Sequence, residues 1–147
     1  MPSAPAILVV DDADDIRMLV RTVFTRVGWR VTETGRGAAV SDAIRRDHPD
    51  VVLLDVQMAD QDGWQTLDNL RRSPDTADLP VVLCSVKGHP DDRERGWRLG
   101  CDGFVAKPFA IEDLVAEVTA ATTRSPSERA AWQHVQLKRL SVREDSS

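Results

Sequence analysis

Four short segments of this chain are apolar at every position and end abruptly at a polar residue. They are residues 6–10 before Asp11, 51–54 before Asp55, 80–84 before Ser85 and 103–106 before Lys107. Strands without polar alternation are buried on both faces, which is typical of parallel sheets covered by helices. Residues 29–33 alternate between apolar and polar side chains and predict a fifth strand, nearer an edge.

Apolar residues with helical spacing separate these predicted strands. The predicted helices cover residues 16–27, 39–47, 64–70, 90–99 and 111–118. Strict alternation of strand and helix with short links implies a parallel sheet with right-handed crossovers. The sequence therefore predicts an α/β fold, a doubly wound five-stranded parallel sheet flanked by five helices, and 147 residues fit one such domain.

The polar residues that end the strands predict a functional site. In parallel sheets the site lies beyond the carboxyl ends of the strands, which here carry Asp11, Asp12, Asp55, Ser85 and Lys107. Grouped carboxylates repel each other, and a hard divalent cation such as Mg²⁺ relieves that repulsion. A carboxylate can itself act as a nucleophile, while a lysine and a hydroxyl suit phosphoryl oxygens. The pattern indicates phosphoryl-transfer chemistry.

Five motifs occur together in this chain, in a fixed order and spacing. They lie at residues 7–12, 52–58, 62–63, 82–85 and 103–109. With these motifs, residues 6–121 resemble the response-regulator receiver domain of bacterial two-component signalling, in particular the single-domain, chemotaxis-type receivers. The resemblance implies a flavodoxin-like receiver fold.

The resemblance also implies roles for individual residues at the strand ends. Asp55 becomes the phospho-acceptor, and Lys107 contacts the phosphoryl group. Mg²⁺ or Mn²⁺ is bound by Asp12, Asp55 and the backbone carbonyl of Gln57, with Asp11 acting through water. Each of these residues is present in the chain.

A second group of implied roles concerns switching. Ser85 becomes the switch hydroxyl, Phe104 the rotating aromatic residue, and the peptide bond between Lys107 and Pro108 is expected to be cis. Movement of Ser85 and Phe104 is expected to remodel the surface made by the fourth helix, fifth strand and fifth helix.

Two departures from the family pattern stand out. Ala59 follows Met58 where the family usually has proline, so the loop is expected to be less restrained. Trp97 replaces a smaller aliphatic residue in the fourth helix, where it could contribute to a partner surface.

Composition and charge limit the possible partners. The chain is 41% hydrophobic and 29% charged, with a net charge of −5, so binding of nucleic acid across its whole surface is not expected. Cys84 and Cys101 form no metal or disulfide pattern, no secretion signal is visible, and the apolar runs are too short to span a membrane. A cytoplasmic location and no membrane contact are expected.

Residues 124–147 are predicted to form a separate, partly helical tail after a receiver at residues 1–123. The tail has five basic and three acidic side chains, so it carries +2 and the rest of the chain −7. Its helix is expected to start after a cap at Ser125 or Ser127. It could bind a partner, form a homodimer, dock on the acidic body or remain solvated. It is too short for a DNA-binding domain, so no direct DNA binding is expected.

The leading functional hypothesis is a phosphorylation switch rather than a turnover enzyme. The expected partners are a sensor histidine kinase or phosphotransfer protein, an unknown downstream protein, and possibly a second copy through the switching surface. An alternative is the receiver portion of a longer regulator. A more distant alternative, a Mg²⁺-dependent phosphatase of the haloacid-dehalogenase kind, needs a second aspartate where Gln57 stands.

Overall fold

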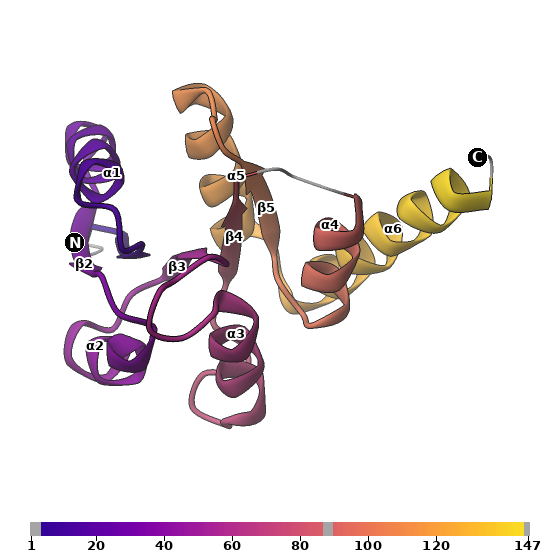
Figure 1. Ribbon diagram of the computed structural model, residues 1–147, viewed down its shortest axis with the longest axis horizontal. Helices are drawn as coiled ribbons and strands as arrows, with labels where there is room; N and C mark the ends of the chain where they lie inside the picture. Colours follow the sequence, from indigo (N-terminus) through magenta and orange to yellow (C-terminus); the bar gives the residue numbers. More distant parts are fainter. Residues whose placement is uncertain (1–3, 87–89, 146–147) are drawn as a thin grey trace.

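The computed structural model describes residues 4–86 and 90–145, and its centre is a five-stranded parallel sheet between layers of helices (Figure 1). The first three residues of the predicted receiver (1–123) and the last two of the predicted tail (124–147) lie outside the described residues. The strands are β1 (Ala6–Val10), β2 (Arg30–Thr34), β3 (Val51–Asp55), β4 (Val81–Ser85) and β5 (Gly103–Ala106). The helices are α1 (Asp14–Arg26), η1 (Gly37–Ala39, 3₁₀), α2 (Val40–Asp47), α3 (Gly63–Arg72), α4 (Pro90–Arg98), α5 (Ile111–Thr123) and α6 (Pro126–Asp145).

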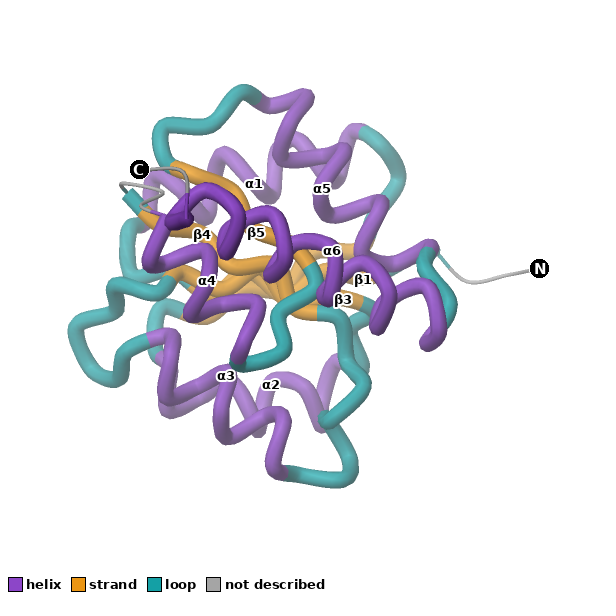
Figure 2. The backbone as a smooth tube through the Cα atoms, turned by 90° about the vertical axis from the view of Figure 1, so that its right-hand side faces the viewer, coloured by secondary structure: helices purple, strands orange, loops and turns teal. Residues whose placement is uncertain are grey.

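The strand order β2-β1-β3-β4-β5 confirms the predicted doubly wound fold, and α6 confirms the predicted C-terminal helical extension. Successive buried side chains of β1, β3, β4 and β5 enter different hydrophobic clusters, as the pleat requires. Ile7 and Val9 pack with Phe24 of α1 and Leu114 of α5, whereas Leu8 belongs to the cluster of α2, α3 and α4. Figure 2 shows α1 and α5 on one side of the sheet and α2 and α3 on the other. The continuous apolar runs therefore supply side chains to the hydrophobic clusters on both faces of the sheet.

Two of the polar strand-end residues lie within the strands rather than after them. Asp55 pairs with Cys84 in the sheet register, and Ser85 pairs with Ala106. The sequence pattern placed the end of each strand one residue earlier, because it stopped at the change from apolar to polar. Their backbones are thus fixed by the ladder of the sheet. None of the helices within residues 4–86 and 90–145 is long and apolar enough to cross a membrane.

Helix α3 starts in direct contact with the end of β3. Its N-cap is Asp62, whose carboxylate accepts a hydrogen bond from the backbone N–H of Gln65 at 2.7 Å. The backbone N–H of Gly63 donates to the carbonyl of Val56 at 3.0 Å. A Cβ atom at Gly63 would lie 2.4 Å from the carbonyl oxygen of Asp55. Only glycine allows this approach.

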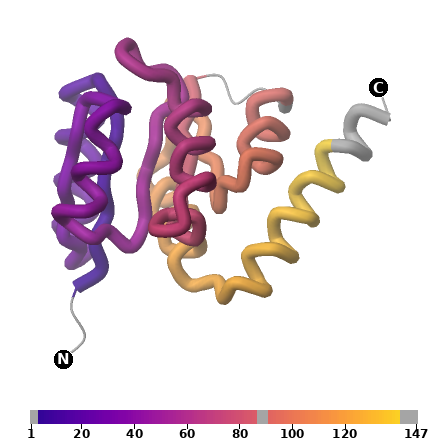
Figure 3. Tube along the Cα trace, turned by 90° about the horizontal axis from the view of Figure 1, so that it is seen from below, coloured from indigo at the N-terminus to yellow at the C-terminus, as the bar shows by residue number. Residues whose placement is uncertain are grey.

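The tail docks back on the body, which selects one of the possibilities that the sequence left open. Ser125 is the cap: its hydroxyl accepts from the Glu128 N–H at 3.2 Å, and its own N–H donates to the Glu128 carboxylate at 3.1 Å. Helix α6 then runs obliquely along α4 (Figure 3). Leu140 is buried in the same cluster as Trp97. Trp97 is only 5% exposed, so the idea that it faces a partner was wrong.

Asp102, in the turn before β5, joins α6 to the rest of the fold. Its side chain is 1% exposed, and it forms ion pairs with Arg71 of α3 at 2.9 Å and Arg129 of α6 at 2.6 Å. It also accepts a hydrogen bond from the backbone N–H of Val81 at 2.9 Å. A buried carboxylate needs such partners because its removal from water is costly. One side chain therefore links α3, β4 and α6.

Replacement of Gly63 by alanine should destabilise the fold by about 1–3 kcal/mol, because the new methyl group meets fixed backbone atoms. Urea unfolding would measure the loss. Gly35→Ala is the matched control, since its Cβ meets chiefly the flexible end of Arg17. Equal stability of the two variants would contradict the proposed close approach of α3 to β3.

Replacement of Arg129 by alanine should lower the free energy of unfolding by about 2 kcal/mol, because Asp102 then keeps a single cationic partner. Arg139→Ala, an exposed change on the same helix, should cost less than about 0.5 kcal/mol. Thermal and urea unfolding of both variants compare the two sites. A loss no larger for Arg129 than for Arg139 would show that α6 is not anchored through Asp102.

Candidate functional site

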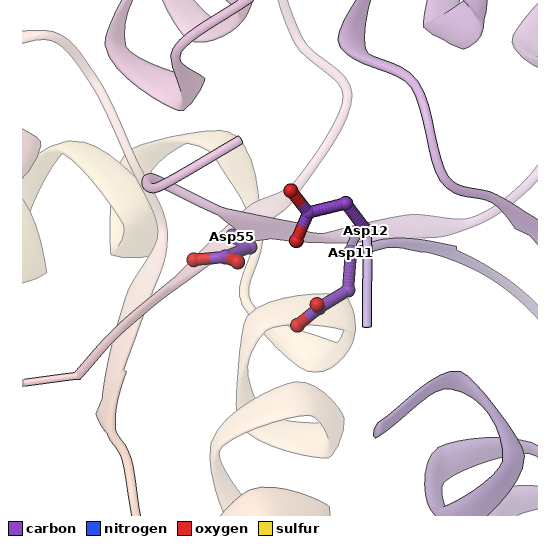
Figure 4. Close-up of side chains that lie close together, drawn as sticks. All are labelled: Asp11, Asp12 and Asp55. Carbon is purple, nitrogen blue, oxygen red and sulfur yellow. The ribbon is translucent and has the colours of Figure 1, made fainter. Parts of the chain in front are cut away.

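Three carboxylates meet at the carboxyl edge of the sheet, as the sequence predicted. Asp11 and Asp12 follow β1, and Asp55 ends β3 on the neighbouring strand. Figure 4 shows the three side chains converging, and their nearest oxygens all lie within 4.8 Å of one another. Asp11 and Asp55 are buried, whereas Asp12 is exposed. The cluster is therefore open to solvent on the Asp12 side.

Lys107, at the end of β5, supplies positive charge to this cluster. Its ammonium nitrogen lies 2.6 Å from Asp11 Oδ2 and 3.4 Å from Asp55 Oδ2. The backbone N–H of Lys107 donates to the carbonyl of Ser85 at 2.7 Å, which fixes it beside β4. The peptide bond between Lys107 and Pro108 is cis, in agreement with the expectation. Among the residues that the structure describes, Lys107 is the cation that forms ion pairs with this cluster of three carboxylates, so the cluster retains excess negative charge.

The environment shifts the pKa values of Asp55 and Lys107. Burial raises the pKa of Asp55 above its usual range, and the charge of Asp11 adds to this, while the Gln57 N–H and Lys107 oppose it. For Lys107, burial favours the neutral amine, but the hydrogen bond to Asp11 and the charge of Asp55 outweigh it, so its pKa is raised. Lys107 is thus held as a cation next to a carboxylate that resists ionisation.

The loop after β3 is tied to this cluster through its backbone. The N–H of Gln57 donates to Asp55 Oδ1 at 3.0 Å, and the N–H of Ala59 donates to Asp12 Oδ2 at 3.1 Å. A proline at position 59 has no N–H and could not make the second bond. Ala59 thus connects this loop to Asp12 through a bond that proline could not make, while the expected lower restraint of the loop stays a prediction.

The two expected switch residues lie on neighbouring strands. Ser85 is fully buried at the end of β4, where its hydroxyl donates to Asp92 Oδ2 of α4 at 3.3 Å. Phe104 of β5 is 5% exposed, and the guanidinium of Arg93 lies 5.0 Å from the centre of its ring. Phe104 thus packs against α4, and its rotation on phosphorylation stays a prediction.

Residues 7–119 match the family model described as "Response regulator receiver domain". The match covers most of the chain and all five motifs. The chain belongs to the response-regulator receiver family.

Curated relatives of this receiver are longer proteins. The chain is 38% identical over 119 residues to the probable transcriptional regulatory protein TcrX of Mycobacterium tuberculosis, covering 81% of this chain and 50% of TcrX. It is 32% identical over 139 residues to the phosphate regulon transcriptional regulatory protein PhoB of Escherichia coli, covering 95% of this chain and 60% of PhoB. The receiver thus spans about half to three fifths of these relatives.

Solved structures show the same fold. A putative response regulator from Chloroflexus aurantiacus matches with a TM-score of 0.79 and 26% identity, covering 83% of this chain and all of that one. The chemotaxis protein CheY4 of Vibrio cholerae matches with a TM-score of 0.76 at 23% identity, covering 81% of this chain and 99% of that one. The second likeness concerns the fold alone.

Sequence reasoning missed the α4 residues that contact the switch positions. Asp92 and Arg93 stand in a polar segment without a motif, and their contacts with Ser85 and Phe104 depend on how α4 lies on the sheet. The only available signal was the run of charged residues at the start of this helix. Such runs are common on solvated helix faces and do not point to a particular contact.

Substitution of Asp55 by asparagine should stabilise the receiver at neutral pH. Because the folded pKa of Asp55 is raised above its ordinary value of 3.8, its ionisation opposes folding at higher pH. The difference in free energy of unfolding between Asp55→Asn and wild type should therefore be greatest at neutral pH and shrink as the pH falls toward 3.8. Urea unfolding across this range measures it. The exposed change Asp75→Asn controls for loss of one charge, and a constant difference for Asp55→Asn would contradict the assignment.

Proposed function

We propose that this receiver accepts a phosphoryl group on Asp55 from a histidine kinase or phosphotransfer protein and acts as a switch for protein contacts. The observation that carries the proposal is the placement of Asp55: a buried carboxylate within 4.8 Å of two others and 3.4 Å from a lysine ammonium. A purely structural cap would not need this convergence of charges from β1, β3 and β5. Membership of the receiver family supports the same role.

The residues at the cluster fit a hard divalent cation. Mg²⁺ prefers oxygen ligands and commonly uses a few carboxylates with water and phosphate. Asp12 and Asp55 would hold it with the carbonyl of Gln57, and Asp11 would act through water; Mn²⁺ suits the same oxygen donors. The excess negative charge left by Lys107 supports this assignment. When bound, the ion would offset the charge of the carboxylates and of an arriving phosphoryl group.

The chain's own residues account for acceptance of the phosphoryl group. An oxygen of the Asp55 carboxylate attacks phosphorus, forming an O–P bond as the P–N bond to the kinase histidine breaks, and the imidazole leaves. Lys107 stays protonated and stabilises the negative charge on the phosphoryl oxygens. The Gln57 N–H holds Asp55 Oδ1 and so limits rotation of the carboxylate. The chain is thus a reactant in its own modification and not a turnover enzyme.

Ser85 is suited to detect the modification. It ends β4, whose residue Cys84 pairs with Asp55 of β3, so its hydroxyl lies at the same edge of the sheet. We assign it as the donor to a phosphoryl oxygen on Asp55. Its present contact is with α4, so a change of partner would be transmitted to the surface of α4, β5 and α5. Phe104 would rotate as Ser85 changes its hydrogen-bond partner.

What the phosphorylated receiver acts on is a separate proposal. TcrX and PhoB are named as transcriptional regulatory proteins, and the receiver spans 50% and 60% of them. The expectation that this chain does not itself bind DNA stays a prediction, supported by its net charge of −5. A role as the receiver of a longer regulator is the second candidate, because these relatives extend beyond the matched part. Homodimerisation and a cytoplasmic location also remain predictions.

Incubation with acetyl phosphate and Mg²⁺ should increase the intact mass by one phosphoryl group. Asp55→Asn should abolish this increase, whereas the exposed variant Asp75→Asn should retain it. Chelation of the metal by EDTA should reduce the rate at least about tenfold, because the carboxylate charges are then uncompensated. Unchanged phosphorylation of Asp55→Asn would refute the assignment of the acceptor.

A further inference from the structure

The hydroxyl of Ser85 is held by α4 and not by the acidic cluster. Ser85 has no exposed surface, and its Oγ donates to Asp92 Oδ2 across 3.3 Å. A buried hydroxyl needs a partner, because leaving it unpaired costs about 1–3 kcal/mol. Within residues 4–86 and 90–145, Asp92 is the side chain that accepts this hydrogen bond. The first turn of α4 is thereby fastened to the end of β4.

The next residue of the same turn makes a second contact with the sheet. Arg93 lies over the ring of Phe104, 5.0 Å from its centre, in cation–π geometry. Further along α4, a Cβ atom at Gly96 would lie 2.8 Å from a methyl group of Leu83 and 3.5 Å from the Phe104 ring. The helix is therefore closely seated on β4 and β5, and consecutive residues at its start contact Ser85 and Phe104.

Serine has a single O–H donor, so it can donate to one acceptor at a time. We propose that Asp92 is a latch: it holds the Ser85 hydroxyl in the unphosphorylated protein and competes for it with the phosphoryl group on Asp55. This inference rests on the proposed function, since it requires Ser85 to donate to the phosphoryl group. Phosphorylation then breaks the bond between Ser85 and Asp92 and releases the first turn of α4. The contact between Arg93 and Phe104 couples that release to β5.

The latch lowers the affinity of the unmodified protein for a phosphoryl group. The hydrogen bond from Ser85 to Asp92 must break before Ser85 can donate to the phosphoryl oxygen. Beryllofluoride, a phosphoryl mimic, is a suitable probe, titrated with Mg²⁺ into the full chain by calorimetry. Asp92→Ala should bind it about fivefold more tightly than wild type, the effect of one lost hydrogen bond. The amide resonances of α4 in unliganded Asp92→Ala should also shift toward their positions in the beryllofluoride-bound wild type.

Loss of a negative charge could by itself favour an anion, so the test is a double-mutant cycle with Ser85→Ala. In the Ser85→Ala background, Asp92→Ala should leave the affinity unchanged within about twofold. Asp91→Ala removes the same charge from the neighbouring, exposed position of the turn and should also change the affinity less than twofold. Asp92→Asn keeps an acceptor oxygen and should lie between wild type and Asp92→Ala.

Two results would overturn the latch alone: unchanged affinity in Asp92→Ala, or equal tightening by Asp92→Ala with and without Ser85. Failure of the wild type to bind beryllofluoride and to accept a phosphoryl group from acetyl phosphate would instead overturn the proposed function, and the latch with it. Because Asp92 is only partly buried, its variants are expected to fold, and Asp92→Asn gives the same comparison with the smallest change in shape.

Discussion

Burial of β1, β3, β4 and β5 on both faces of the parallel sheet is the constraint on which the rest of this structure depends. A strand covered by helices on each side can place polar residues only at its ends. Because all five strands run in the same direction, their carboxyl ends share one edge. Asp11, Asp55 and Lys107 come from separate strands and still meet within hydrogen-bond or ion-pair distance. The site is a geometric consequence of the sheet.

This constraint explains how much the sequence could predict. The apolar runs and their polar ends indicated the strands, their common direction and the convergence of Asp11, Asp12 and Asp55, because these depend on periodicity and topology alone. Small errors arose at the boundaries: Asp55 and Ser85 belong to the strands, since backbone pairing continues after the apolar residues stop. Local signals limited the cap of α6 to Ser125 or Ser127, and the structure selects Ser125, whose N–H and hydroxyl both form hydrogen bonds with Glu128.

Contacts between distant segments could not be predicted in this way. The expected loosening of the loop at Ala59 followed correctly from the missing proline ring, but the freed N–H donates to Asp12, 47 residues away. The sequence allows Trp97 to contribute to a partner surface because it does not reveal the position of α6, but in the structure Trp97 is buried in a cluster with Leu140 of the tail. The contact between Ser85 and Asp92 likewise depends on the seating of α4. In each of these three cases the contact is made by an atom from another part of the chain, which local sequence patterns do not reveal.

The ion pairs of Asp102 bear on where this receiver ends as a folding unit. The family match stops at residue 119, before α6 begins. Yet a guanidinium of α6 pairs with the buried carboxylate of Asp102, which also contacts α3 and β4, and Leu140 belongs to a cluster that contains residues of β1. Elements that share a buried ion pair and a hydrophobic cluster are expected to belong to one cooperative unit. We therefore expect α6 to unfold together with the rest of the receiver, although the family model ends before it; the similarity to PhoB, over 95% of the chain, also reaches α6. A fragment cut at residue 119 would leave Asp102 with one cationic partner and would uncover the side of α4 on which α6 packs.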